Sequence, residues 1–220
     1  MKLICSSSPS PIFLLALLLV TIGPAFSQRQ LISSKDYLSA VYARPDGVPA
    51  NERMRRIETI QETMDSGTVI KTSTIVEEFA PPGRTRRFEK ALENGKTSET
   101  ESILVDRILY TRKDDGAWWK DDLRNDSQTY GVGSDAGGAC AQYAVENVVV
   151  DGTPVKLFTE LIVTGGKELK FFESRTWIAS DGLRYRFESS KGQLSPRVET
   201  WRSVSIYDYE AKVKIDAPVK

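Results

Sequence analysis

The most constraining feature of the sequence is a run of turn signals that divides residues 141–208 into extended segments. Asp151-Gly152, Gly165-Gly166, Asp181-Gly182 and Lys191-Gly192 each separate two runs rich in Val, Ile, Thr, Tyr, Phe and Trp. Such dipeptides tolerate the positive φ that tight hairpin turns require. The succession of turns therefore predicts a meander, a single curved sheet in which neighbouring strands pair antiparallel.

Extended segments also fill the first half of the chain, which alternates only partly between apolar and polar residues. We interpret this half as a wing of the sheet that is partly solvated on both faces. Trp118 and Trp119, adjacent on a hairpin at 106–121, must face opposite sides, one of them in the core. The other predicted strands are 55–63, 68–80, 84–92, 96–105, 141–150, 154–164, 168–179, 183–189, 197–209 and a short terminal strand at 213–215.

One segment has helical rather than extended periodicity. Residues 31–41 place Leu31, Tyr37, Leu38 and Val41 at roughly helical spacing, and Ser33 or Ser34 can serve as the N-cap. The apolar stripe of so short a helix must be buried, and the sheet is the only large apolar surface available.

The composition is that of one soluble domain and excludes several kinds of site. The 220 residues carry 30 Lys and Arg against 30 Asp and Glu, which gives no reason to expect nucleic-acid binding. The absence of histidine excludes a Ser-His or Cys-His dyad within the chain and the commonest zinc ligand. We expect no cofactor and no metal.

Residues 1–27 have the pattern of a cleaved secretory signal peptide. An apolar run at 12–22 is too short for a comfortable membrane span, and Ala25 and Ser27 are the small residues expected before a cleavage site. Cys5 precedes the apolar run, so we expect no lipid anchor. An uncleaved anchor is the alternative, because the first residues carry little positive charge. We predict a secreted protein whose single domain covers residues 28–220.

Cys140 is then the only cysteine of the mature chain and follows a loop-like segment at 123–139. The thiol is reactive, forms an intermolecular disulfide, or is an inert, partly buried group. We favour the inert state because no histidine can activate it and no second cysteine can resolve it. The long loop is either a lid or a surface excursion.

Two groups of charged residues invite a functional interpretation. The arginines could form a docking patch for anionic headgroups or protect an exposed strand edge, which we favour. The aspartates could bind calcium, but their spacing does not match a calcium-binding loop, and we favour solvated hairpin ends. The arginines are Arg53, Arg55, Arg56, Arg84, Arg86 and Arg87, and the aspartates are Asp114, Asp115, Asp121, Asp122 and Asp126.

An enzymatic function would need catalytic groups at a suitable spacing. Glu160 and Glu173 lie on adjacent predicted strands and could form a carboxylate pair for glycoside or other acid–base chemistry. No spacing supports such a pair beyond chance, so we expect a protein that is not an enzyme.

Four features in order resemble the bacterial outer-membrane lipoprotein-carrier superfamily (LolA/LppX-like) over about residues 31–218. They are the signal peptide with a short helix, Asp106-Arg107-Ile108-Leu109-Tyr110 before Trp118-Trp119, Trp177-Ile178-Ala179-Ser180-Asp181-Gly182-Leu183, and Tyr207-Asp208-Tyr209 followed by Val213-Lys214-Ile215-Asp216-Ala217-Pro218.

This resemblance implies a fold and a function. The fold would be mainly β, a single strongly curved antiparallel sheet forming an incomplete β-barrel of about ten or eleven strands, with one or two short helices on its concave side. The function would be non-catalytic binding or carriage of lipid acyl chains or lipoproteins in the periplasm. Membrane-associated proteins would be partners, and we expect a monomer.

A ligand cavity on the concave side would be lined by apolar side chains of the meander. Replacing Leu161 with arginine should then abolish lipid uptake. The alternative is a structural or protein-interaction domain in which the same residues form a filled core. The predicted lining residues are Leu157, Leu161, Leu183, Tyr185, Phe187, Trp177 and Trp201.

Overall fold

The computed structural model describes residues 29–42, 53–64, 66–123, 139–165 and 169–218. The predicted signal peptide and nearly all of the predicted loop at 123–139 lie outside these ranges. Within them, no helix has the length and apolarity that crossing a membrane requires.

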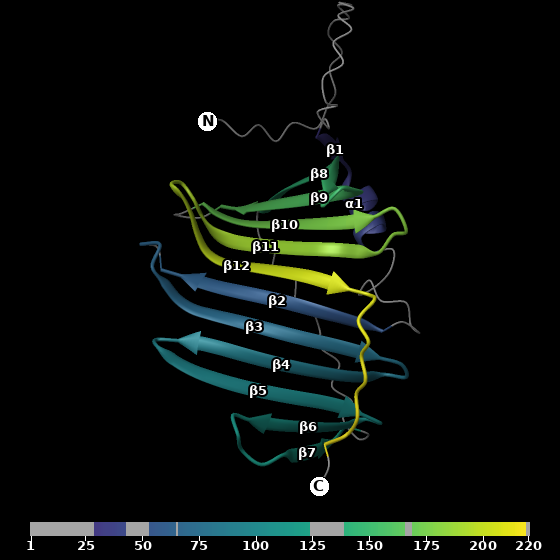
Figure 1. Cartoon of the computed structure of the whole chain (residues 1–220). Helices are drawn as coiled ribbons and strands as arrows, with labels where there is room; N and C mark the ends of the chain where they lie inside the picture. Colours follow the sequence, from purple (N-terminus) through teal and green to yellow (C-terminus); the bar gives the residue numbers. More distant parts are fainter. Residues whose placement is uncertain (1–28, 43–52, 65, 124–138, 166–168, 219–220) are drawn as a thin grey trace, which may run out of the picture.

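The described residues form one twelve-stranded sheet in which every neighbouring pair is antiparallel (Figure 1). The order across the sheet is β1-β8-β9-β10-β11-β12-β2-β3-β4-β5-β6-β7, and because β1 and β7 are not paired the sheet is not closed into a barrel. The strands are β1 (Gln30–Ile32), β2 (Met54–Thr63), β3 (Val69–Ala80), β4 (Arg84–Glu93), β5 (Lys96–Val105), β6 (Ile108–Lys113), β7 (Trp119–Asp122), β8 (Ala139–Val150), β9 (Thr153–Thr164), β10 (Lys170–Ala179), β11 (Arg184–Leu194) and β12 (Arg197–Asp208).

The sheet consists of two meanders joined by their inner strands. One meander runs from β2 to β7 and the other from β8 to β12, and β12 pairs with β2 from Trp201 opposite Glu62 to Asp208 opposite Arg55. The predicted meander over 141–208 is therefore confirmed. Its pairing with the N-terminal wing through the last strand carries no local sequence signal.

The single described helix, α1 (Ser34–Val41), defines one face of the sheet, which we call the helix face. Ser33 is the N-cap, and its Oγ accepts a hydrogen bond from the Asp36 amide at 3.1 Å. The buried Tyr37 hydroxyl lies 3.1 Å from Ser174 Oγ of β10. The predicted helix is thus confirmed over its central and last turns, whereas Gln30–Ile32 forms β1 and pairs with β8.

The opposite face is crossed by the C-terminal segment 209–218, which we call the strap (Figure 1). Following the register from Ser174 strand by strand places Ser98 of β5 on the helix face. Because side chains alternate along a strand, Ile103 and Val105 lie on the other face. We call this second side the strap face.

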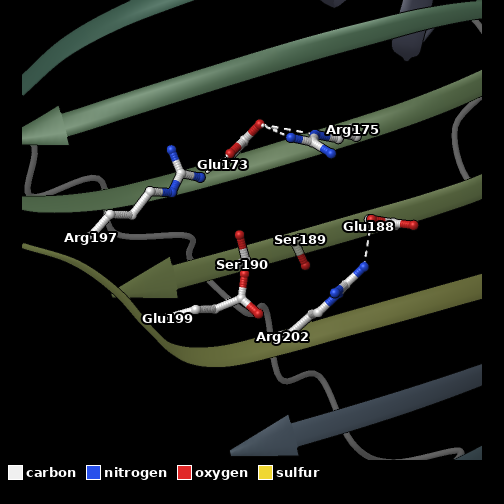
Figure 2. A pocket seen from close by; sticks show the side chains of 8 residues that line it. All are labelled: Glu173, Arg175, Glu188, Ser189, Ser190, Arg197, Glu199 and Arg202. Atoms are coloured by element: carbon white, nitrogen blue, oxygen red, sulfur yellow. Dashed lines mark hydrogen bonds and ion pairs between the residues drawn. The ribbon is translucent and has the colours of Figure 1, made fainter. Parts of the chain in front are cut away.

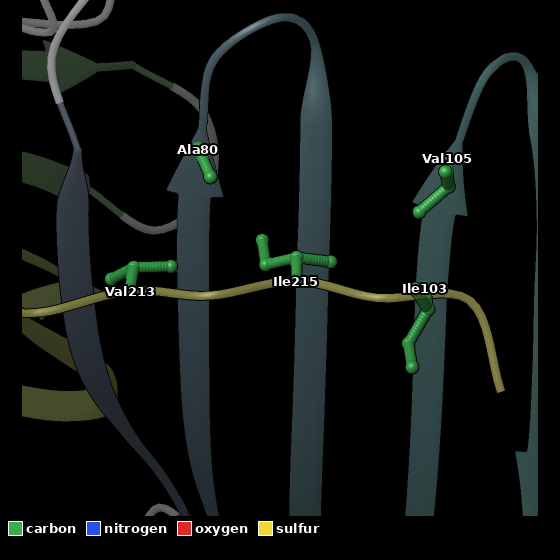
Figure 3. Close-up of a cluster of buried hydrophobic side chains, with 5 residues drawn as sticks. All are labelled: Ala80, Ile103, Val105, Val213 and Ile215. Carbon is green, nitrogen blue, oxygen red and sulfur yellow. The ribbon is translucent and has the colours of Figure 1, made fainter.

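The strap buries two apolar side chains against the strap face. Val213 and Ile215 pack on Ala80, Ile103 and Val105 of strands β3 and β5 (Figure 3). The predicted strand at 213–215 is wrong, because this segment runs across the strands and cannot continue their hydrogen-bond ladder.

The adjacent tryptophans behave as predicted. Trp118 is half-buried and packs against the cluster beneath the strap, whereas Trp119 is 57% exposed. One ring is therefore part of the core and the other faces solvent.

The predicted turn at Lys191-Gly192 is also wrong. Strand β11 continues to Leu194 and the chain turns at Ser195-Pro196, while Lys191 and Gly192 lie at a bulge opposite β12. A Cβ atom on Gly192 would lie 1.9 Å from the Val198 carbonyl oxygen. The glycine therefore serves a close approach of two backbones rather than a hairpin turn.

The first wing is polar on both faces, as predicted, and ion pairs between its strands lie on each face. On the strap face Glu78 pairs with Arg55 and Arg86, and on the helix face Glu77 pairs with Arg56 and Arg87. Strands β2, β3 and β4 are all interior. The arginines therefore do not protect an edge, and most of their charge is matched by β3 carboxylates rather than presented as a basic docking patch.

Removing the strap's apolar contact should destabilise the fold. We expect Ile215→Ala to lower the free energy of unfolding by about 2–5 kcal/mol, because it leaves a cavity in a buried cluster. Lys214→Ala is the matched control, because its side chain is 84% exposed and should cost less than about 0.5 kcal/mol. Urea denaturation of the two variants measures both changes, and equal effects would contradict the described packing.

Gly192→Ala should be destabilising for a different reason. The added methyl group meets backbone atoms that cannot rotate away, so we expect a loss of about 1–3 kcal/mol or more. Gly165→Ala should be tolerated, since no atom lies within 4 Å of the added Cβ. Thermal unfolding of both variants measures the difference, and an unaffected Gly192 variant would rule out the bulge.

Candidate functional site

A groove of about 580 Å³ opens beside the ends of β9, β10 and β11, and we call it the lysine groove. Most of its side chains belong to the helix face, on the part of that face farther from the α1 contacts with Phe158 and Ile178. Its lining residues are Ile162, Thr164, Lys170, Phe171, Phe172, Lys191, Gly192, Gln193 and Thr200.

Strand register explains how these residues meet. Ile162 of β9 lies opposite Phe172 of β10, and Phe172 lies opposite Lys191 of β11. Residues opposite each other in antiparallel strands project to the same side of the sheet. Ile162 and Phe172 therefore supply adjacent apolar side chains, with Lys191 beside them.

The two lysines of the groove carry no ion pair with any described residue. Lys191 Nζ lies over the Trp201 ring, 5.4 Å from its centroid. Lys170 starts β10 and is exposed. Both ammonium groups remain available to an anion.

The Tyr37 hydroxyl lies next to Ser174, which is two residues beyond Phe172 of the groove in the direction of α1. Ser174 Oγ donates a hydrogen bond to Glu160 at 3.2 Å, so the Tyr37 hydroxyl donates to Ser174. The Tyr37 ring also lies 4.9 Å from that of Tyr143. Burial raises the pKa of Tyr37 to about 12, which keeps its hydroxyl a neutral donor.

A second pocket, of about 440 Å³, lies beyond Tyr37. It is mainly apolar and lies between α1 and the ends of β9 and β10. Ala40, Phe158 and Ile178 are among its lining residues. Tyr37 and its hydrogen-bonded partners thus separate two pockets that follow the same pair of strands.

The strap face carries a different kind of pocket, small and charged, of about 100 Å³. Arg175 and Arg197 approach the Glu173 carboxylate from either side at 2.7 Å and 2.5 Å, and Arg202 lies 3.3 Å from Glu188 (Figure 2). Burial alone would raise the pKa of Glu173, but hydrogen bonds from Arg197 and Arg175 outweigh burial and lower it. Glu173 is therefore held as an ionised partner of two arginines.

The carboxylate pair considered for acid–base chemistry does not form. Glu173 is opposite Leu161, whereas Glu160 is opposite Ser174 on the other side of the sheet. The sheet therefore separates the two carboxylates, and they cannot act on one substrate.

The predicted cavity residues do not share a face, so this part of the prediction is wrong. Leu157, Leu161 and Trp177 lie on the strap face, whereas Phe187 and Trp201 lie on the helix face. None of the seven predicted residues lines the lysine groove.

The remaining two predicted residues lie at the β10–β11 turn. Leu183 precedes β11, and the Tyr185 hydroxyl donates to Asp151 at 3.0 Å. A register shift between Trp177 and Ile178 places Arg184 on the same side as Phe187, with its guanidinium 5.6 Å from that ring. The predicted alternation along 183–188 therefore breaks at the first residues of β11.

Sequence reasoning missed the groove because β9 is apolar on both faces. Leu157, Leu161 and Val163 form one apolar row, and Phe158 and Ile162 form the other. When both rows of alternating side chains are apolar, the alternation does not show which row lines a cavity. The helpful signal would have been the lysines at 170 and 191, which are aligned with the second row.

The other sequence candidates show no site among the described residues. Asp114 Oδ1 accepts the Glu99 amide at 2.9 Å at a hairpin end, and Asp126 lies outside the described part of the chain. In that part, no three His, Cys, Asp or Glu residues are grouped to hold a metal ion. Cys140 is exposed rather than partly buried, and its reactivity stays a prediction.

Comparison with known proteins adds no functional assignment. No protein-family model matches the chain, and no curated protein matches it in sequence.

The Glu173 ion pairs predict a pH-dependent contribution to stability. Because the folded-state pKa is lowered, the contribution is present above the ordinary glutamate pKa of 4.5 and is lost as the pH falls through the lowered value. Glu173→Gln should therefore be less stable than the parent chain at pH 7, with the difference shrinking in acid.

Urea denaturation at several pH values measures this difference. Glu199→Gln is the control, because Glu199 lines the same pocket without an ion pair to the described residues. A Glu173→Gln difference that stays constant from neutral to strongly acidic pH would contradict the assignment.

Proposed function

We propose that the protein is a non-catalytic binder or carrier of amphiphiles that holds an acyl chain in the lysine groove. The observation that carries this proposal is a groove of about 580 Å³ in which Ile162 and Phe172 lie side by side, next to two lysines that form no ion pair with a described residue. Pockets for small ligands commonly measure about 300–1,000 Å³ and combine apolar walls with a few polar groups.

The energetics of acyl chains support this assignment. Each buried CH₂ contributes about 0.8 kcal/mol, so partial burial of a chain over Ile162 and Phe172 suffices for reversible binding. Reversible binding suits carriage, because the cargo must also be released.

The proposal includes the location, oligomeric state and partners that we expect from the sequence. The protein is secreted by a cleaved signal peptide and acts as a periplasmic monomer. It exchanges a lipid or lipoprotein acyl chain with membrane-associated partners. The helix face is the concave side of a strongly curved, half-barrel sheet.

A protein-interaction domain is the second candidate, and one observation favours it. Ile206, Ile57, Val76 and Phe88 lie in register across β12, β2, β3 and β4 on the strap face. Ile206 is 47% and Ile57 42% exposed. Exposed apolar rows bordered by charges are typical of protein contacts.

Native mass spectrometry of the mature protein distinguishes the two functions. Purification from a bacterial periplasm, followed by incubation with mixed lipids, should give a stoichiometric adduct of lipid mass that organic solvent releases. A mass of the bare protein under both conditions would overturn lipid binding and favour the interaction domain.

Two adjacent residues provide a matched test of the site. Ile162→Arg should abolish binding of a fluorescent fatty acid, because it places a charge among the apolar side chains of the groove. Leu161→Arg should leave binding unchanged, because Leu161 faces the strap side next to Glu173. This expectation reverses the one drawn from the sequence. Loss of binding in the folded Leu161 variant alone would place the site on the strap face.

A further inference from the structure

We propose that the lysine groove selects amphiphiles whose headgroup is an anion, a carboxylate or a phosphate, bound between Lys170 and Lys191. This inference rests on the proposed function and adds the chemical class of the ligand. It is carried by the placement of the two lysines relative to the apolar residues and to the carboxylates that the structure describes nearby.

The two lysines lie on the same side of adjacent strands. Lys191 is opposite Phe172, and Lys170 is two residues before Phe172 on β10. They are therefore diagonal neighbours, a relation in which the backbones are about 7–8 Å apart. Two ammonium groups on flexible stems of this spacing can both contact one carboxylate or phosphate.

Among the described residues, no carboxylate competes for the lysines on their side of the sheet. Lys191 is opposite Trp201 of β12, and Trp201 is opposite Glu62 of β2. Glu62 is the first acidic residue in this direction, and its backbone is two strands, or about 10 Å, from that of Lys191. Glu199 lies nearby in sequence but lines the charged pocket of the strap face. Among the neutral side chains of the groove, Thr164 and Gln193 can donate further hydrogen bonds to an anion, whereas the Thr200 hydroxyl donates to the Lys191 carbonyl at 3.3 Å.

The contrast with the arginines makes the lysines distinctive. Glu173 and Glu188 of the neighbouring strap-face pocket are held by Arg175, Arg197 and Arg202. Lys170 and Lys191 have no such partner among the described residues. Within the described part of the chain, an anionic ligand is what would compensate their charge.

The charges also fix the direction of the ligand. Glu160 lies at the Tyr37 end of the groove, where a carboxylate repels an anionic headgroup. From Thr164 to Glu160 is four residues of β9, or about 13 Å at about 3.3 Å per residue. The headgroup therefore binds at the lysine end, and the chain extends over Ile162 and Phe172 towards Tyr37.

The cation–π contact assigns a positioning role to Trp201. Its ring lies 5.4 Å from Lys191 Nζ, on the side away from Lys170. Such a contact holds an ammonium group without neutralising its charge. The indole thus limits the directions in which Lys191 can point while leaving its N–H groups free for the headgroup.

Calorimetric titration with ligands that share one chain tests the inference. The probes are dodecanoate, dodecyl phosphate, the uncharged dodecyl glycerol ether and the cationic dodecyltrimethylammonium, together with inorganic phosphate alone. We expect the two anionic amphiphiles to bind most tightly and their affinity to fall with added salt.

Two variants identify the groups that confer this preference. Replacing both lysines, Lys170→Gln with Lys191→Gln, should lower the affinity for dodecanoate about tenfold or more and leave the uncharged ether unchanged. Lys214→Gln is the control, because its 84% exposed side chain lies on the strap. Circular dichroism confirms that each variant is folded.

The possible outcomes separate this inference from the proposed function. Equal binding of the anionic and uncharged probes, or an unaffected double variant, would overturn the anion preference while leaving acyl-chain binding intact. Inorganic phosphate that binds as tightly as dodecyl phosphate would overturn it too, because the chain would then contribute nothing. If none of the amphiphiles binds, the proposed function itself fails.

Discussion

The pairing of β12 with β2 is the interaction on which the rest of the structure depends. It joins residues about 145 positions apart, as in the hydrogen bond from Ser203 Oγ to Glu58, so its formation must overcome the entropy of closing a very long loop. Once it forms, two meanders that each pair only with themselves become one sheet. The strap then leaves the end of β12 and crosses to β3 and β5, where Val213 and Ile215 find their apolar partners. The pairing of β12 with β2 therefore brings together the first and last parts of the domain.

The charges of the strap face and those of the lysine groove differ in whether they have partners. On the strap face, carboxylates that are only 5–12% exposed each hold two arginines: Glu78, Glu101, Glu173 and Glu188. Paired charges of this kind add specificity of register rather than an anion site. On the helix face, the lysine groove carries cations without carboxylates, beside apolar side chains. A cluster of charged residues therefore does not by itself identify the candidate site. The lysine groove is identified by ammonium groups that form no ion pair with a described carboxylate.

Much of the sheet could be predicted from local chemistry, and the failures have identifiable causes. The turns at Asp151-Gly152 and Asp181-Gly182 were recognised because positive φ is costly for most residues. Lys191-Gly192 gave the same signal but marks a bulge, since glycine also permits two backbones to approach closely. The apolar row of Leu157 and Leu161 was taken for a cavity wall, although Phe158 and Ile162 give β9 a second apolar row. Glycine occurs both in tight turns and at close backbone contacts, and apolar residues occur both in cores and in cavity walls. Each error arose from such a double role.

The sequence by itself determined most of the strands with their approximate bounds, the short capped helix and the polar character of the first wing, but not β1. These properties depend on turn propensities, alternation and capping, which act between residues close in the chain. Tertiary structure alone decided the order of the two meanders, which face each apolar row meets, and which charges remain without partners. Those outcomes depend on the register between β12 and β2 and on shifts at single bulges. A one-residue change of register exchanges the faces, and no local pattern encodes it.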